Sequence, residues 1–172
     1  DNAATTPVRP EAAQAALEAM TQGWGNPSSV YALGAQAAAA VKGWRADLAG
    51  ALGCKPEEFF FTSCGSEGDN WAIYAGAEFN RRRGKHIVTT VIEHSAVLEP
   101  VKALERQGCE VTLLQPNSQG TIDPEQIAAA LRPDTALVSI MLVNNELGTV
   151  LPVKEAAQAI KRADCPALLH CD

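Results

Sequence analysis

Four polar clusters in this sequence carry side chains that could bind or transform a small ligand. The first is the run Thr62-Ser63-Cys64-Gly65-Ser66, which combines small residues with hydroxyl groups. It lies between a predicted strand and a predicted helix, so its free backbone amides could bind an anion, most simply a phosphate. Its spacing matches neither a Walker loop nor the Gly-x-Gly-x-x-Gly motif of dinucleotide-binding proteins. These residues alone fit a phosphate site and an ordinary strand-to-helix turn equally well.

The other three clusters each follow an apolar segment. His94, in Glu93-His94-Ser95, could serve as an aromatic plate or a proton carrier, or as an ordinary hydrogen-bonded histidine. The pair Asn144-Asn145 opens a polar stretch that could face a ligand or simply shape a turn. Asp172 follows the apolar run 167–171, and a buried carboxylate there would need a cationic partner. Taken singly, each cluster leaves both interpretations open.

Apolar segments and amphipathic segments alternate along the chain and predict the scaffold that positions these clusters. Strands are expected at 58–62, 86–90, 109–114, 135–142 and 167–171, and helices at 9–20, 31–52, 71–77, 96–107, 123–131 and 152–162. This alternation predicts an α/β fold in three layers, α/β/α, with a largely parallel sheet. Ligands bind such sheets at the carboxyl ends of the strands, which is where the polar clusters fall.

Composition narrows the class of protein. The 172 residues are 47% hydrophobic and 20% charged, which is typical of one globular domain with its own core. The net charge of −6 predicts no general affinity for nucleic acid or an anionic membrane, and we expect neither a membrane span nor a signal peptide. Five cysteines without a Cys-x-x-Cys pair predict reduced thiols in the cytoplasm, and the scattered histidines predict no metal site.

The polar clusters belong to longer segments that resemble the cysteine desulfurases of the NifS/IscS type, pyridoxal-phosphate enzymes of the class V aminotransferase group. The segments occur in family order from one end of the chain to the other. They are Asp1-Asn2-Ala3-Ala4-Thr5-Thr6, Gly25-Asn26-Pro27-Ser28-Ser29, Phe61-Thr62-Ser63-Cys64-Gly65-Ser66-Glu67, Thr89-Thr90-Val91-Ile92-Glu93-His94-Ser95-Ala96-Val97, Val138-Ser139-Ile140-Met141, Asn144-Asn145-Glu146-Leu147-Gly148-Thr149 and His170-Cys171-Asp172.

The resemblance implies a role for five residues of this chain. Gly65 and Ser66 match the loop that binds the phosphate of pyridoxal 5'-phosphate. His94 matches the catalytic imidazole that stacks on the cofactor ring, and Asn145 matches the amide that contacts the phenolic oxygen and the substrate carboxylate. Asp172 matches the carboxylate that pairs with the protonated ring nitrogen. Such a pairing would keep the ring electron-withdrawing.

The resemblance also implies an activity and its partners. Enzymes of this type convert L-cysteine to L-alanine and leave a persulfide on an enzyme cysteine, for transfer to a sulfur-acceptor protein in iron–sulfur cluster assembly or thiolation. A cytoplasmic homodimer is expected. Two alternatives stay open: a selenocysteine lyase or another class V enzyme, and a catalytically incomplete half protein.

The resemblance predicts a fold-type-I large domain of which only a part is present. Residues 1–30 are expected to form an N-terminal segment with an active-site loop, and residues 31–172 the N-terminal part of the cofactor-binding domain. The cofactor-binding lysine, the persulfide cysteine and the substrate-binding arginine are expected beyond Asp172, so we expect residues 1–172 alone to be inactive. Gly65-Ser66 replaces the usual Ala-Thr and keeps a hydroxyl, while Cys64 stands where glycine is common.

Overall fold

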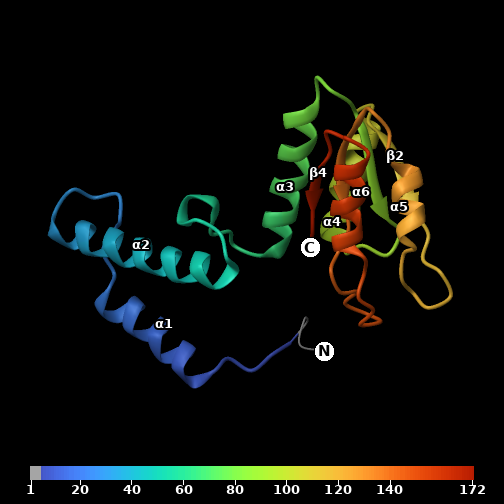
Figure 1. Cartoon of the computed structure of the whole chain (residues 1–172). Helices are drawn as coiled ribbons and strands as arrows, with labels where there is room; N and C mark the ends of the chain where they lie inside the picture. The colour runs from blue at the N-terminus through green and yellow to red at the C-terminus, as the bar shows by residue number, and fades with distance from the viewer. Residues whose placement is uncertain (1–4) are drawn as a thin grey trace. The chain divides into compact units, whose positions relative to one another are not determined.

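The computed structural model describes residues 5–172 and divides the chain into two compact units, Asp1–Phe61 and Thr62–Asp172 (Figure 1). The first four residues of the segment 1–6 that carries part of the family resemblance lie outside the described residues. The domain boundary at residue 30 concerns the whole protein and stays a prediction.

The first unit contains two helices and a short 3-10 turn. Helix α1 spans Pro10–Gln22, α2 spans Ala32–Leu52, and η1 spans Pro56–Glu58. Pro10 begins α1, where its missing N–H costs no helical hydrogen bond. Gly53 ends α2 with φ 72°, and its N–H donates to the last carbonyls of the helix. Both predicted helices are confirmed.

The second unit is a parallel four-stranded sheet with the strand order β2-β1-β3-β4. The strands are β1 (His86–Thr90), β2 (Glu110–Leu114), β3 (Thr135–Ser139) and β4 (Leu168–His170). The helices are α3 (Gly65–Asn80), α4 (Ser95–Arg106), α5 (Pro124–Ala130) and α6 (Val153–Arg162). The three connections between successive strands each contain a helix, α4 between β1 and β2, α5 between β2 and β3, and α6 between β3 and β4 (Figure 1).

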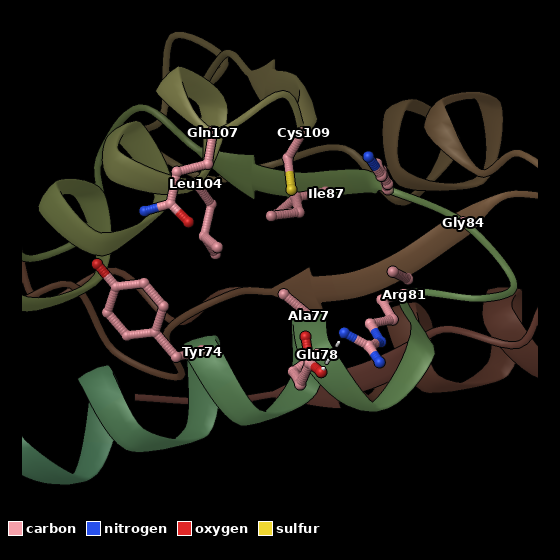
Figure 2. Close-up of a pocket in the computed structure, with 11 residues that line it drawn as sticks. Tyr74, Ala77, Glu78, Arg81, Gly84, Ile87, Leu104, Gln107 and Cys109 are labelled. Carbon is pink, nitrogen blue, oxygen red and sulfur yellow. Dashed lines mark ion pairs between the residues drawn. The ribbon is translucent and has the colours of Figure 1, made fainter.

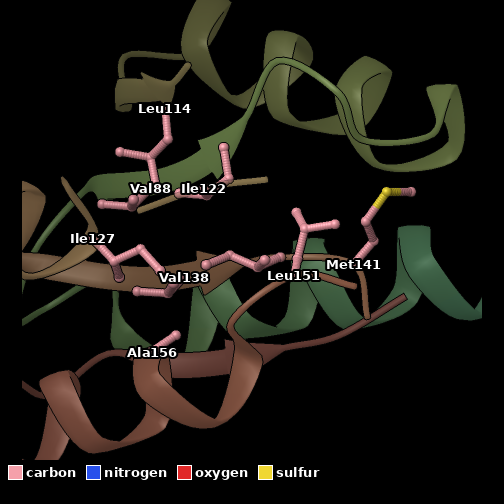
Figure 3. Close-up of a cluster of buried hydrophobic side chains, with 9 residues drawn as sticks. Val88, Leu114, Ile122, Ile127, Val138, Met141, Leu151 and Ala156 are labelled. Atoms are coloured by element: carbon pink, nitrogen blue, oxygen red, sulfur yellow. The ribbon is translucent and has the colours of Figure 1, made fainter. Parts of the chain in front are cut away.

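Residues of one strand alternate between two apolar cores, one on each face of the sheet. Ile87 and Leu137 pack with residues of α3 and α4. Val88 and Val138, one position further on, pack with Ile127 of α5 and with residues of α6 (Figure 3). The two central strands, β1 and β3, are buried along their whole length, as expected for strands that are covered on both faces. The predicted α/β/α architecture is therefore confirmed.

The predicted buried strand at 58–62 is wrong. Residues 56–58 form η1, and residues 59–62 have no regular structure. Phe60 and Phe61 are exposed. The carbonyl oxygen of Phe59 accepts a hydrogen bond from the Arg45 side chain rather than from a neighbouring strand. An apolar run becomes a strand only where a neighbouring strand accepts and donates its backbone hydrogen bonds, which the four-stranded sheet does not do here.

Candidate active site

The carboxyl ends of β1, β3 and β4 lie at one edge of the parallel sheet, and three candidate residues follow them. His94 comes after β1, Asn145 after β3 and Asp172 after β4. Backbone hydrogen bonding between the segments that follow β3 and β4 continues beyond the two strands. The N–H of Leu142 donates to the carbonyl oxygen of Asp172 at 3.0 Å. This bond holds the backbone of Asp172 at the edge, while its side chain remains exposed.

The first turn of α3 presents backbone amides at its surface. Gly65 and Ser66 are the first two helical residues, so α3 begins earlier than the expected residue 71, and both are exposed. The amide of Gly68 makes a helical bond to the carbonyl of Cys64 at 3.3 Å, so the amides of residues 65–67 precede the helical ladder. A Cβ built on Gly65 would meet no atom within 4 Å. An anion therefore has room to approach this turn.

The same turn already favours a negative charge. The pKa of the Cys64 thiol is lowered, first because the backbone N–H of Glu67 donates to the sulfur and then because the Ser63 hydroxyl does. The pKa of the Glu67 carboxyl is lowered as well, chiefly because the backbone N–H of Ser63 donates to it. Both shifts are those expected for groups that accept hydrogen bonds near the N-terminus of a helix.

His94 is the N-cap of α4, and its two ring nitrogens differ in their hydrogen bonding. Its Nδ1 accepts a hydrogen bond from the backbone N–H of Ala96 at 3.1 Å, so that nitrogen carries no proton in this arrangement. The neutral imidazole then holds its proton at Nε2, and the ring is exposed at the sheet edge. Asn70 ties this region to α3 by donating to the carbonyls of Ser66, at 2.8 Å, and of Ala96, at 3.3 Å.

The two neighbouring asparagines have different environments. Asn144 is buried, and its Nδ2 donates to the carbonyl oxygen of Ile92 at 3.0 Å. Its Oδ1 accepts from the N–H groups of Glu146, at 3.0 Å, and Leu147, at 2.9 Å. Asn145 is exposed. Asn144 therefore shapes the loop, as one sequence interpretation held, and a ligand contact of the exposed Asn145 stays a prediction.

Asn144→Ala should lower the free energy of unfolding by about 2–4 kcal/mol, because it removes the three hydrogen bonds that the buried Asn144 side chain makes to the backbone of Ile92, Glu146 and Leu147. Asn145→Ala is the matched control on the neighbouring position and should change the free energy of unfolding by less than about 0.5 kcal/mol. Thermal and urea unfolding of both variants would measure this difference. Equal effects of the two substitutions would contradict the assignment of Asn144 to the loop.

Glu93 is a buried acid beside His94 that our sequence analysis did not single out. Its two carboxylate oxygens each accept from the backbone N–H of Met141 at 3.1 Å, and Oε1 also accepts from the Thr90 hydroxyl at 2.8 Å. Burial raises the pKa of this carboxyl from 4.5 to about 7, although the hydrogen bonds oppose the shift. Glu93 thus joins the loop that carries His94 to the segment after β3. Asn144, from the segment after β3, makes a second connection by donating to Ile92 in the loop that carries His94.

Electrostatic effects show that Asp172 lies close to the other polar groups of this edge. Burial raises the pKa of Asp69 in α3, and the negative charge of Asp172 raises it further. His170 and His94 act in the opposite direction on the same carboxyl. The charge of Asp172 also contributes to the raised pKa of Glu93. The charges of Asp172 and His94 thus both act on Asp69 of α3, and a shared cofactor site formed by these residues stays a prediction.

Sequence reasoning located the five exposed candidates but missed the buried polar residues beneath them, which are Asp69, Glu93, Ser139 and His170. One signal was available, since His170 is a polar residue inside the otherwise apolar run 167–171. A buried polar group needs a partner, and such a residue next to a candidate indicates a supporting contact.

A pocket of about 410 Å³ lies elsewhere in this unit, at the end of the sheet where the strands begin (Figure 2). Tyr74 and Ala77 of α3 line it opposite Leu104 of α4, and none of the five candidate residues takes part. Among residues 5–172, His, Cys, Asp and Glu form no group of three or more suited to a metal ion. Within the same range, no helix combines the length and the apolarity needed to cross a bilayer.

Comparisons with known proteins match the whole chain. Residues 1–172 match the family model described as aminotransferase class-V. A cysteine desulfurase IscS from Methanosarcina thermophila is 48% identical over 161 residues, which are 94% of this chain and 40% of that protein. A cysteine desulfurase from Nostoc sp. is 45% identical over 172 residues, which are 100% of this chain and 42% of that protein.

Solved structures give the same result. A NifS-like protein superposes with a TM-score of 0.96 at 37% identity, over 100% of this chain and 47% of that chain. DndA from Streptomyces lividans has a TM-score of 0.86 at 42% identity, over 98% of this chain and 47% of that chain. A structure described as SspA in complex with cysteine has a TM-score of 0.88 at 35% identity, over 98% and 49%. The chain spans less than half the length of each of these relatives.

Proposed function

Since this chain belongs to the class-V aminotransferase family, we propose that the protein carrying it is a cysteine desulfurase that uses pyridoxal 5'-phosphate and L-cysteine. One observation supports the proposal: His94 and Asp172 follow the carboxyl ends of two parallel strands, and their charges act on Asp69 of α3, the helix that begins at the exposed residues Gly65 and Ser66. L-Alanine and an enzyme-bound persulfide would be the products.

The residues at this edge fit pyridoxal phosphate, on which the family generally depends. The first-turn amides of α3, with the Ser66 hydroxyl, would hold the phosphate, because that turn already favours negative charge. The carboxylate of Asp172 would pair with the ring nitrogen. The chemistry that the cofactor supplies when bound is withdrawal of electrons from the α-carbon of an amino acid.

The residues of this chain would position the reactants. His94 offers the flat face of its ring and a proton at Nε2, because the N–H of Ala96 occupies Nδ1. To take up a second proton at Nδ1, the imidazole would have to release this N-cap bond. Asn145 would bind the phenolic oxygen of the cofactor and the carboxylate of the substrate. The Glu93 and Asn144 contacts would keep both side chains in place.

Three further parts of the proposal rest on the family resemblance. The protein would act as a homodimer, in the cytoplasm, and would pass sulfur to an acceptor protein. The lysine, cysteine and arginine that complete the reaction would come from outside residues 1–172.

The proposal is tested with the complete protein that carries this chain. Purified protein with pyridoxal phosphate should form L-alanine from L-cysteine in proportion to the sulfide released under reducing conditions. Preference for selenocysteine over cysteine would support the lyase alternative instead. Absence of alanine formation in a protein that retains the cofactor would contradict the proposed activity.

Ser66→Ala should weaken binding of pyridoxal phosphate by about 1.5–3 kcal/mol, because a hydrogen bond to a charged phosphate is lost. Equilibrium dialysis of the cofactor against both forms measures the difference. Ser118→Ala, which removes an exposed hydroxyl from the turn before α5, is the matched control and should bind normally. Equal affinity of Ser66→Ala and the control would remove this hydroxyl from the site.

A further inference from the structure

A row of polar side chains crosses the sheet just before the strands end. Ser139 of β3 is in register with Thr89 of β1 on one side and with His170 of β4 on the other. Leu137 lies two residues before Ser139 and belongs to the core under α3 and α4, so the row faces those helices. Thr89 and Ser139 are fully buried. Among the described residues the Thr89 hydroxyl has no hydrogen-bond partner, so the hydrogen bonds of this row begin at Ser139.

His170 connects this row to α3. Its Nδ1 lies 2.8 Å from the hydroxyl oxygen of Ser139, and its Nε2 lies 3.4 Å from a carboxylate oxygen of Asp69. The side chains of His170 and Asp69 are each only 11% exposed. The imidazole is therefore held between a strand and the second turn of α3, the helix whose first turn carries Gly65 and Ser66.

Acidic side chains outnumber the imidazoles around this pair. Three acids, Asp69, Glu93 and Asp172, face the edge together with the imidazoles of His94 and His170. Asp172 lies two residues beyond His170, and its negative charge is felt at Asp69. A second carboxylate close to Asp172 would compete with it for any cation at the site, unless a neighbouring positive charge offsets that carboxylate.

We propose that His170 is a positioning residue that, as an imidazolium held between Ser139 and Asp69, fixes the end of β4 against α3 and offsets the charge of Asp69 beside Asp172. Both N–H groups would then donate, Nδ1–H to the Ser139 oxygen and Nε2–H to the Asp69 carboxylate. The proposal rests on the proposed function, because it assumes that Asp172 faces the ring nitrogen of the cofactor.

The test is a charge signature in the complete protein loaded with pyridoxal phosphate. The pH midpoint at which the absorption of the bound cofactor changes should fall by roughly one unit in Asp69→Asn, because a negative charge that favours the protonated form is removed. The midpoint should rise by roughly one unit in His170→Gln, because a positive charge is removed. The double variant should return close to the original midpoint, and Glu99→Gln, which removes an exposed carboxyl from α4, should stay there.

Opposite shifts distinguish a charge pair from a purely structural lesion, which would move both variants in the same direction. Shifts in one direction, or no shift in either variant, would overturn the proposal. A second measurement needs no cofactor: the Tm changes of the two single variants should be non-additive in the double variant of the cofactor-free protein. Additive changes would also overturn it. Failure of the unsubstituted protein to bind the cofactor would count against the proposed function, while the Tm measurement still decides on the pair.

Discussion

Asp172→Asn should leave pyridoxal phosphate bound and lower the rate of alanine formation by roughly 100-fold or more. The phosphate would still be held by the first turn of α3, which the substitution does not touch. The neutral amide of asparagine would no longer stabilise a proton on the ring nitrogen, so the ring would withdraw electrons less strongly. The backbone should be unaffected, because Leu142 bonds the main-chain oxygen of Asp172 rather than its side chain.

The measurement pairs steady-state alanine formation with cofactor content for each purified variant. Asp47→Asn, an exposed acid in α2, is the matched control and should keep the normal rate. An Asp172→Asn protein that holds the cofactor and turns over at the control rate would show that the ring nitrogen has another partner. A protein that loses the cofactor outright would show that Asp172 contributes mainly to binding.

The scaffold of the second unit could be predicted because its two central strands, β1 and β3, are buried on both faces. Such strands appear as short continuous apolar runs between turns, and β1 begins and ends at the predicted residues 86 and 90. Parallel strands place all their carboxyl ends at one edge, so polar residues after separate strands were expected to meet. His94, Asn145 and Asp172 do follow three such strands.

Local sequence could not predict features that depend on partners far along the chain. The apolar run 58–62 has a strand-like composition, but its backbone bonds depend on a neighbour that the composition does not reveal. The two adjacent asparagines are identical in type, and only the contact of Asn144 with Ile92, 52 positions earlier, distinguishes them. The partnership of His170 with Asp69 likewise joins residues from a strand and a helix that are distant in sequence.

Glu93 should make the stability of the protein depend on pH in a direction opposite to that of an ordinary paired acid. Its pKa is 4.5 in an open environment and about 7 when folded, so the folded state binds its proton more tightly between these values. Stability from this residue is therefore complete below about pH 4.5 and is lost as pH rises toward 7. The 2.5-unit difference corresponds to about 3 kcal/mol at pH 7 and above.

Glu93→Gln keeps an oxygen that can accept from Met141 and removes the titrating group. The variant should match the original protein near pH 5 and exceed its free energy of unfolding by up to about 3 kcal/mol at pH 8. Urea unfolding at a series of pH values measures this, with Glu99→Gln as the control for loss of an exposed acid. A variant that is less stable at every pH would mean that the charged form of Glu93 holds the loops together. If the expected gain in stability at pH 8 is found, the buried acid costs stability at neutral pH. Its position would explain why it is retained, because the same carboxyl fixes the loop that presents His94.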